Sequence, residues 1–173
     1  MTKITPEQLT QQGWAKFEAS DFGDACGDFG AAIDLDPDYE PAYLGLGWAE
    51  LRLSNAGMAE NAFITYLSKI SGSDDDATAG LAFAYDAQEK YGDAIEKAEQ
   101  LLSANPSWSF THDPGVNHLD VALVLAEAYY QTAEYSQSLS IVQEYFDASF
   151  SPDLGTDEGR AQLADKLQEL YTG

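Results

Sequence analysis

The apolar residues of this chain follow a helical period, and the same arrangement of them returns along the sequence. The clearest copy runs from Gly13 to Pro37, where an apolar periodic segment is followed by a turn-like stretch at 20–23 and by a second apolar segment that ends at Asp36-Pro37. Apolar residues three and four positions apart are typical of amphipathic helices, and proline cannot continue a helical hydrogen-bond ladder. This segment therefore predicts two short helices packed back to back.

The period of the repetition is about thirty-four residues, because Gly13 and Phe29 correspond to Gly47 and Phe63. A fixed period of this size indicates a helical repeat array. We expect a single all-α domain over 1–173 with units at about 6–39, 40–73, 74–107 and 119–152.

Two segments depart from the repeat. The repeat pattern is interrupted at 107–118, where about ten extra residues precede the fourth unit. Insertions in repeat arrays form loops that often lie on the binding face. The segment at about 156–171 carries an apolar stripe of Leu163, Leu167 and Leu170. We expect it to be a terminal helix that caps the array.

The repeated motif resembles the tetratricopeptide repeat (TPR). A small residue such as Ala82 is followed three positions later by an aromatic residue such as Tyr85, then by an Ala, a further aromatic residue and a closing Pro. The resemblance covers about Pro6 to Pro152 without the insertion. It implies a right-handed superhelical array (an α-solenoid) whose first helices line a concave groove that binds peptides or protein surfaces. It therefore implies a non-catalytic interaction scaffold with a protein or peptide partner.

The expected groove carries large apolar side chains. Each small residue of the first three units is followed by an aromatic residue, and in this family that position faces the groove. Residues three positions further along fall near the same face, Arg52 is the main cation there, and the fourth unit has Glu127 instead of an aromatic residue. The candidate partner-binding residues are Trp14, Phe17, Trp48, Leu51, Arg52, Phe83, Glu127 and Tyr130.

Two interpretations of this apolar groove stay open. A partner segment binds in it, with Trp14, Trp48 and Phe83 as anchors, or the insertion fills it with Trp108 and Phe110. Self-association of a structural repeat protein of the cell envelope through the same surface is a further alternative. One more expectation concerns the first helices, where Lys16 and Glu50 replace the usual Tyr at equivalent positions and are placed for an interhelical ion pair.

The charge of the chain excludes some partners. Thirty acidic and eight basic residues give a net charge of −22, and such a field repels phosphate backbones and anionic membrane faces. We expect no nucleic acid partner. A solvated surface, as in proteins of salt-adapted organisms, is favoured over an acidic docking site for one basic partner.

The sequence shows no recognisable catalytic or metal-binding motif. The insertion holds His112, Asp113 and His118, with Asp120 beside it, but their spacing matches no metal motif and reads as a turn followed by a helix start. A metal or small-ligand site at 107–120 is therefore kept only as an alternative. The lone Cys26 excludes an internal disulfide, and no motif of a hydrolase or nucleotide-binding site appears. We expect no cofactor, no metal and no enzymatic activity.

The compartment stays open between the cytoplasm and the periplasm. No run approaches the ~18 uninterrupted apolar residues of a membrane-spanning helix, and the first residues have no signal pattern. A bacterial envelope lipoprotein trimmed of its anchor would have the same sequence features.

Overall fold

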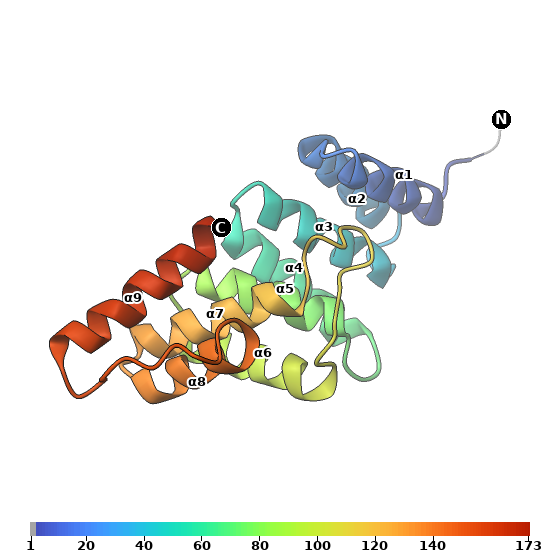
Figure 1. The fold of residues 1–173 in the computed structure, drawn as a ribbon. Coiled ribbons are helices and arrows are strands. Elements are labelled where there is room, and N and C mark those ends of the chain that lie inside the picture. Colours follow the sequence, from blue (N-terminus) through green and yellow to red (C-terminus); the bar gives the residue numbers. More distant parts are fainter. Residues whose placement is uncertain (1–2) are drawn as a thin grey trace.

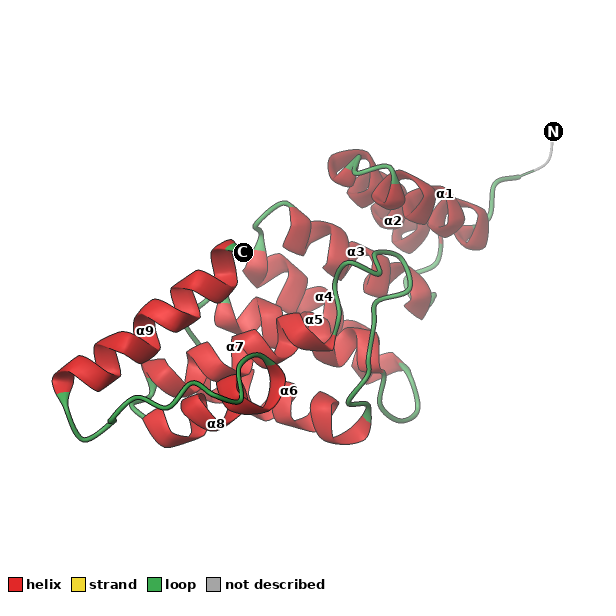
Figure 2. Cartoon of the chain, viewed as in Figure 1, coloured by secondary structure: helices red, strands yellow, loops and turns green. Residues whose placement is uncertain are grey.

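The computed structural model describes residues 3–173, and these residues form helices, turns and one isolated β-bridge (Figures 1 and 2). No helix in this range is long and apolar enough to cross a membrane. The helices are α1 (Pro6–Glu18), α2 (Phe22–Leu35), α3 (Glu40–Arg52), α4 (Ala56–Lys69), α5 (Asp75–Asp86), α6 (Tyr91–Ala104), α7 (His118–Gln131), α8 (Tyr135–Tyr145) and α9 (Asp157–Thr172).

The first eight helices form four successive pairs that stack into an elongated array (Figure 1). Each odd-numbered helix packs on its own partner and also contacts the next odd-numbered helix, so that α1, α3, α5 and α7 form one continuous layer. This arrangement confirms the all-α repeat array that the sequence predicted.

Helix α9 closes the array at its C-terminal end, where it contacts α7 and α8. Leu163 and Leu167 are 0% and 1% exposed in a cluster with Leu123 and Val142, whereas Leu170 is only partly buried at its edge. The prediction of a capping helix is confirmed. The stripe is buried because the last repeat would otherwise expose its apolar face.

Glycines inside the helices make the close stacking of the first units possible. A Cβ atom on Gly45 would lie 2.2 Å from the ring of Phe29, and one on Gly80 would lie 2.2 Å from the ring of Phe63. Cβ atoms on Gly13 and Gly47, in the preceding first helices, would lie 2.7 and 2.6 Å from the same two rings. Each phenylalanine ring therefore packs against two neighbouring helices. This close contact explains why glycine stands at these helical positions, although each glycine costs a helix about 1 kcal/mol of stability.

The turn inside each helix pair repeats one geometry. Ser20, Ser54, Glu89 and Ala133 all have a positive φ, between 58° and 65°. The residue after each of them donates its N–H back to a carbonyl five residues earlier, as in a Schellman cap. The four pairs thus share one turn although none of these positions is glycine.

The predicted ion pair between Lys16 and Glu50 is wrong. Lys16 Nζ lies 2.6 Å from the Asp28 carboxylate on its own partner helix α2. Glu50 is 6% exposed and accepts a hydrogen bond of 2.7 Å from the side chain of Asn55. Lys16 is paired with a carboxylate and Glu50 is hydrogen-bonded to a neutral amide, each within its own helix pair, so the two side chains do not bridge neighbouring repeats.

Candidate functional site

The segment between α6 and α7, residues 105–117, lies across the layer of first helices rather than projecting into solvent (Figure 1). It is closed on itself: Phe110 donates its N–H to Val116 over 2.9 Å, and His118 donates to the Trp108 carbonyl over 2.8 Å. We call this segment the insertion loop. Its shape orients two aromatic side chains toward α3, where they are nearly fully buried.

Aromatic stacking fills the N-terminal part of the groove. The Phe110 ring stacks on Trp48 with centroids 4.0 Å apart, and Trp108 stacks on the same indole at 6.4 Å. Phe110 also meets the rings of Trp14 and Phe17 edge-on, at 6.1 and 5.9 Å. As a result, Trp48, Trp108 and Phe110 are only 2%, 3% and 1% exposed.

Polar contacts at the rim of the loop fix its position. The Trp108 indole N–H donates to Asp76 on α5 over 2.8 Å. The His112 ring is stacked on Trp14 with centroids 3.7 Å apart. Its Nδ1 lies 2.9 Å from a Glu18 carboxylate oxygen.

The remaining tie connects the loop with α3. The Arg52 guanidinium lies 2.6 Å from the Asp113 carboxylate and 4.5 Å from the centroid of the Phe22 ring. The insertion loop therefore contacts three first helices, and it joins the first three repeats into one packed unit.

The candidate metal ligands of the insertion are not brought together. His112 and Asp113 are bound to different helices, as described, and Asp120 accepts the backbone N–H of Asn117 over 2.8 Å as part of a helix cap. His118 is the first residue of α7. Among residues 3–173 no group of three potential ligand side chains lies close enough together to hold a metal ion.

The insertion loop covers only part of the predicted groove. The rings of Trp14, Phe17 and Trp48 pack against Phe110 of the loop, and Arg52 is paired with the loop at its edge. The role of the three rings as partner-binding residues stays a prediction. Other predicted residues remain accessible or partly so, and with Ala87 they form what we call the open section of the groove: Leu51, Arg52, Phe83, Ala87, Glu127 and Tyr130.

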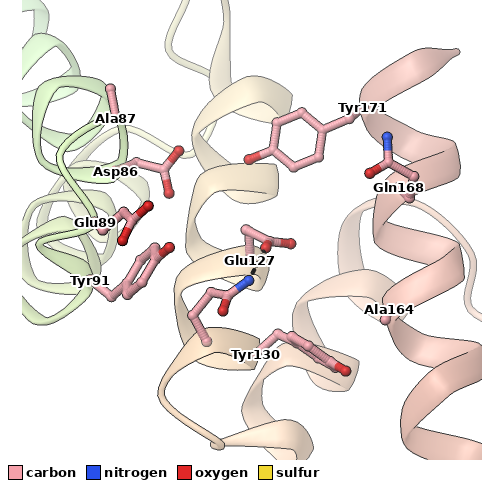
Figure 3. A pocket seen from close by; sticks show the side chains of 10 residues that line it. Asp86, Ala87, Glu89, Tyr91, Glu127, Tyr130, Ala164, Gln168 and Tyr171 are labelled. Atoms are coloured by element: carbon pink, nitrogen blue, oxygen red, sulfur yellow. Dashed lines mark hydrogen bonds between the residues drawn. The ribbon is translucent and has the colours of Figure 1, made fainter.

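Two cavities lie along the open section. The first, of about 310 Å³, is mainly apolar and is bordered by Leu51, Phe83 and Val116. The second, of about 450 Å³, lies between the α5–α6 turn, α7 and α9 (Figure 3). Ala87 borders both cavities, so the two are neighbours along one face of the array.

The second cavity is lined by carboxylates and tyrosines. Asp86, Glu89 and Glu127 supply the acids. Burial, followed by the negative charge of Glu127, raises the pKa of Asp86 from 3.8 to about 6. The rings are those of Tyr91, Tyr130 and Tyr171.

Sequence reasoning selected only Glu127 and Tyr130 of this set. Asp86, Glu89, Tyr91 and Tyr171 were missed because they belong to a helix end, a turn and the terminal helix. The spacing of the repeat carries no signal for their proximity. The packing of α9 against α7 brings Tyr171 into the cavity.

The stacked helix pairs, their shared turn and their capping helix define a helical repeat protein with the tetratricopeptide-repeat fold. Solved structures show the same fold. MamA from Desulfovibrio magneticus RS-1 is 19% identical, with a TM-score of 0.68 over 84% of this chain and 78% of that one. The first TPR domain of human RPAP3 is 18% identical, with a TM-score of 0.55 over 82% of this chain and 98% of that domain.

YrrB, described as a TPR protein with an unusual peptide-binding site, is 13% identical, with a TM-score of 0.69 over 94% of this chain and 84% of that one. No protein-family model matches the sequence, and no curated protein matches it. The resemblance to the tetratricopeptide repeat that the motif indicated is thus confirmed at the level of the fold.

Proposed function

We propose that this protein is a non-catalytic interaction scaffold that binds an extended segment of a partner protein along the open section of the groove. The observation that carries the proposal is the insertion loop itself. Its side chains Trp108 and Phe110 pack against aromatic residues of the first helices and become almost fully buried. This face therefore already binds aromatic side chains of a connecting segment, although that segment belongs to the same chain.

The open section offers a continuation of that surface. Leu51 and Phe83 border an apolar cavity directly beside the end of the insertion loop at Val116. Exposed apolar patches rimmed by polar residues mark protein–protein interaction sites. A partner segment placed here would extend the contact that the loop begins, without displacing buried aromatic rings.

The comparison with YrrB supports the same class of function, since YrrB is described as a TPR protein with an unusual peptide-binding site. The proposal does not need the loop to leave the groove. Removing Trp108 and Phe110 from their sites would expose large aromatic surfaces, at a cost of several kcal/mol in total.

Site-specific photocrosslinking tests the proposal. A photoreactive amino acid replaces Ala87, which is exposed and borders both cavities. A matched label replaces Met58, which is 58% exposed and lies on α4, the second helix of the second pair. Both proteins are irradiated in an extract of the source cells, and the crosslinked peptides are identified by mass spectrometry.

We expect the Ala87 label to capture a defined segment of one partner, and the Met58 label not to capture it. The captured segment, prepared as a synthetic peptide, should then bind the unlabelled protein and compete with the crosslink. Crosslinks that are the same at both positions would overturn the proposal. Crosslinks to a second copy of this chain would replace it with self-association.

A further inference from the structure

The cavity between the α5–α6 turn, α7 and α9 has a chemistry that selects its ligand. Asp86 ends α5, Glu127 lies on α7, and Tyr171 reaches over them from α9, with the Asp86 carboxylate and the Tyr171 ring pointing toward one another across the space (Figure 3). Tyr91 and Tyr130 line the remaining sides. Acidic oxygens and aromatic faces thus converge on one volume.

Among the residues that the structure describes, the carboxylates of this cavity have no cationic partner. Within residues 3–173 the side chains of Asp86 and Glu89 form no hydrogen bond or ion pair, and Glu127 accepts only from the neutral amide of Gln131. Seven of the eight basic residues are paired elsewhere: Lys16 with Asp28, Arg52 with Asp113, Lys69 with Asp38, Lys90 with Glu60, Lys97 with Glu96, Arg160 with Asp157, and Lys166 with Asp147 and Glu169.

Lys90 makes this separation clear. It stands in the sequence between Glu89 and Tyr91, both of which line the cavity, yet its Nζ lies 2.7 Å from Glu60 on α4. The nearest cation along the chain is thereby directed away from the carboxylates. They remain together, partly desolvated, although like charges repel and burial disfavours the ionised form.

We propose that this cavity binds a lysine or arginine side chain of a partner protein. Asp86 and Glu127 neutralise the cation, and the rings of Tyr91, Tyr130 and Tyr171 surround its aliphatic stem and face its charge. Carboxylates form charge-assisted hydrogen bonds to ammonium and guanidinium groups, and tyrosine rings attract cations over their faces. A volume of about 450 Å³ is ample for one such side chain.

Anionic and apolar ligands fit this cavity poorly. A carboxylate or phosphate would meet three acidic groups, and an apolar side chain would leave the half-buried Asp86 and Glu127 without a counter-charge. The charge of −22 on the whole chain adds a long-range attraction for basic segments. The inference rests on the proposed function, because Ala87 places this cavity beside the apolar one along the open section.

The groups that face Asp86 make the binding dependent on pH. Glu89 from the turn, Tyr91 from α6, Glu127 from α7 and Tyr171 from α9 line the same cavity. Protonation of Asp86, whose pKa is about 6, removes one of the negative charges. A bound cation should therefore lower the pKa of Asp86 and release a proton, and binding should be weaker at pH 5 than at pH 7.5.

Nuclear magnetic resonance titration of the full, isotope-labelled chain tests this inference. The probes are three peptides, acetyl-Gly-Lys-Gly-amide, acetyl-Gly-Arg-Gly-amide and an uncharged analogue with norleucine in place of the lysine. The reporters are the backbone amides of Ala87, Gln131 and Ala164, which border the cavity. The titration is run at about 0.15 M salt, where the screening length is about 8 Å, so that diffuse attraction to the acidic surface is reduced.

Two charge variants provide the comparison. The cavity variant combines Asp86→Asn with Glu127→Gln. The control variant combines Asp34→Asn with Glu158→Gln, which removes the same charge at exposed positions outside the cavity. Thermal melts of both variants establish that they are folded.

We expect each basic peptide to bind at least about tenfold more tightly than the norleucine peptide, because the cation supplies the missing counter-charge. The difference should disappear in the cavity variant and persist in the control variant. Equal binding of the three peptides, shifts spread over the whole surface, or equal losses in the two variants would overturn the inference. Those results would leave the crosslink at Ala87 unaffected, so a failure of this inference is separate from a failure of the scaffold proposal.

Discussion

The two halves of the layer formed by α1, α3, α5 and α7 differ in what covers them. Over the first three repeats the insertion loop covers the groove with stacked aromatic rings, so that Trp48 is 2% exposed. Over the third and fourth repeats the groove is left open and becomes acidic, with Asp86 and Glu127 beside a cavity. One repeated scaffold therefore supports a dry, closed surface at one end and a charged, accessible surface at the other.

The difference follows from which side chains the repeat places on the face. The first helices of the first two units supply Trp14 and Trp48, and exposure of these large apolar rings to water is unfavourable. Phe83 of the third unit stays partly exposed at the start of the open section. The fourth unit supplies Glu127 at the equivalent position. A carboxylate there gains from solvent, so no internal segment is needed to cover it.

Removal of Phe110 should give the largest effect and tests whether the closed half is part of the core. We expect Phe110→Ala to lower the free energy of unfolding by about 3 to 5 kcal/mol, the range for a buried phenylalanine. Tyr130→Ala, in the open half, should lose about 1 to 2 kcal/mol because its ring is only partly buried. Urea denaturation measures both.

Urea denaturation should also be applied to Trp48→Ala and to the double variant Trp48→Ala/Phe110→Ala. The double variant should lose less free energy of unfolding than the sum of the two single losses, since the two rings pack on each other. Equal losses for Phe110→Ala and Tyr130→Ala would contradict the contrast between the halves.

The terminal helix α9 should stabilise the open half nearly as much as the insertion loop stabilises the closed half. Leu167 is 1% exposed between α7 and α9, so Leu167→Ala should cost about 2 to 5 kcal/mol. A chain ended after Gly155 should expose that cluster and aggregate, as judged by light scattering. A shortened protein that stays monomeric and melts like the full chain would show that α9 does not cap the array.

The pH dependence of stability should reveal the uncompensated acid of the open half. The pKa of Asp86 is about 6 in the folded protein against 3.8 ordinarily, so the folded state binds the extra proton between these values and stability falls as pH rises through them. We expect the melting temperature to rise from pH 7.5 to pH 5. Asp86→Asn should stabilise the protein at pH 7.5 by about 1 kcal/mol after allowance for solvent screening.

The variant should also have a flatter pH profile than the parent. Asp34→Asn, which removes one exposed charge, serves as the control for the general repulsion of the acidic surface. An unchanged slope in Asp86→Asn would mean that other groups cause the dependence.

The smallest effect is expected at the rim of the closed half. Arg52 and Asp113 are each about one third exposed, and an ion pair of this kind contributes about 1 kcal/mol or less. Asp113→Asn should therefore change urea stability far less than Phe110→Ala does. A loss of similar size would mean that polar ties, rather than aromatic burial, hold the insertion loop in the groove.

Much of the fold follows from local rules that the sequence displays. The period of small and aromatic residues predicted the helix pairs, because a helix buries residues three and four apart on one face. The place where the copying fails located the insertion, and the leucine stripe located the capping helix. These features depend on short-range spacing, which is written directly in the chain.

The sequence by itself determined that Trp14, Trp48 and Phe83 would share a face, and it left open what covers them. The tertiary structure decided that Trp108 and Phe110 pack on Trp48, that Phe110 also meets Trp14, and that Phe83 stays in the open section. A loop's path depends on its closure and on its contacts with distant helices, such as the one with Asp76 on α5. The acidic cavity depends on the structure still more, because Asp86, Glu127 and Tyr171 come from three helices that meet only when α9 packs on α7. Spacing along a helix is local, whereas the meeting of helix ends and turns depends on the whole stack.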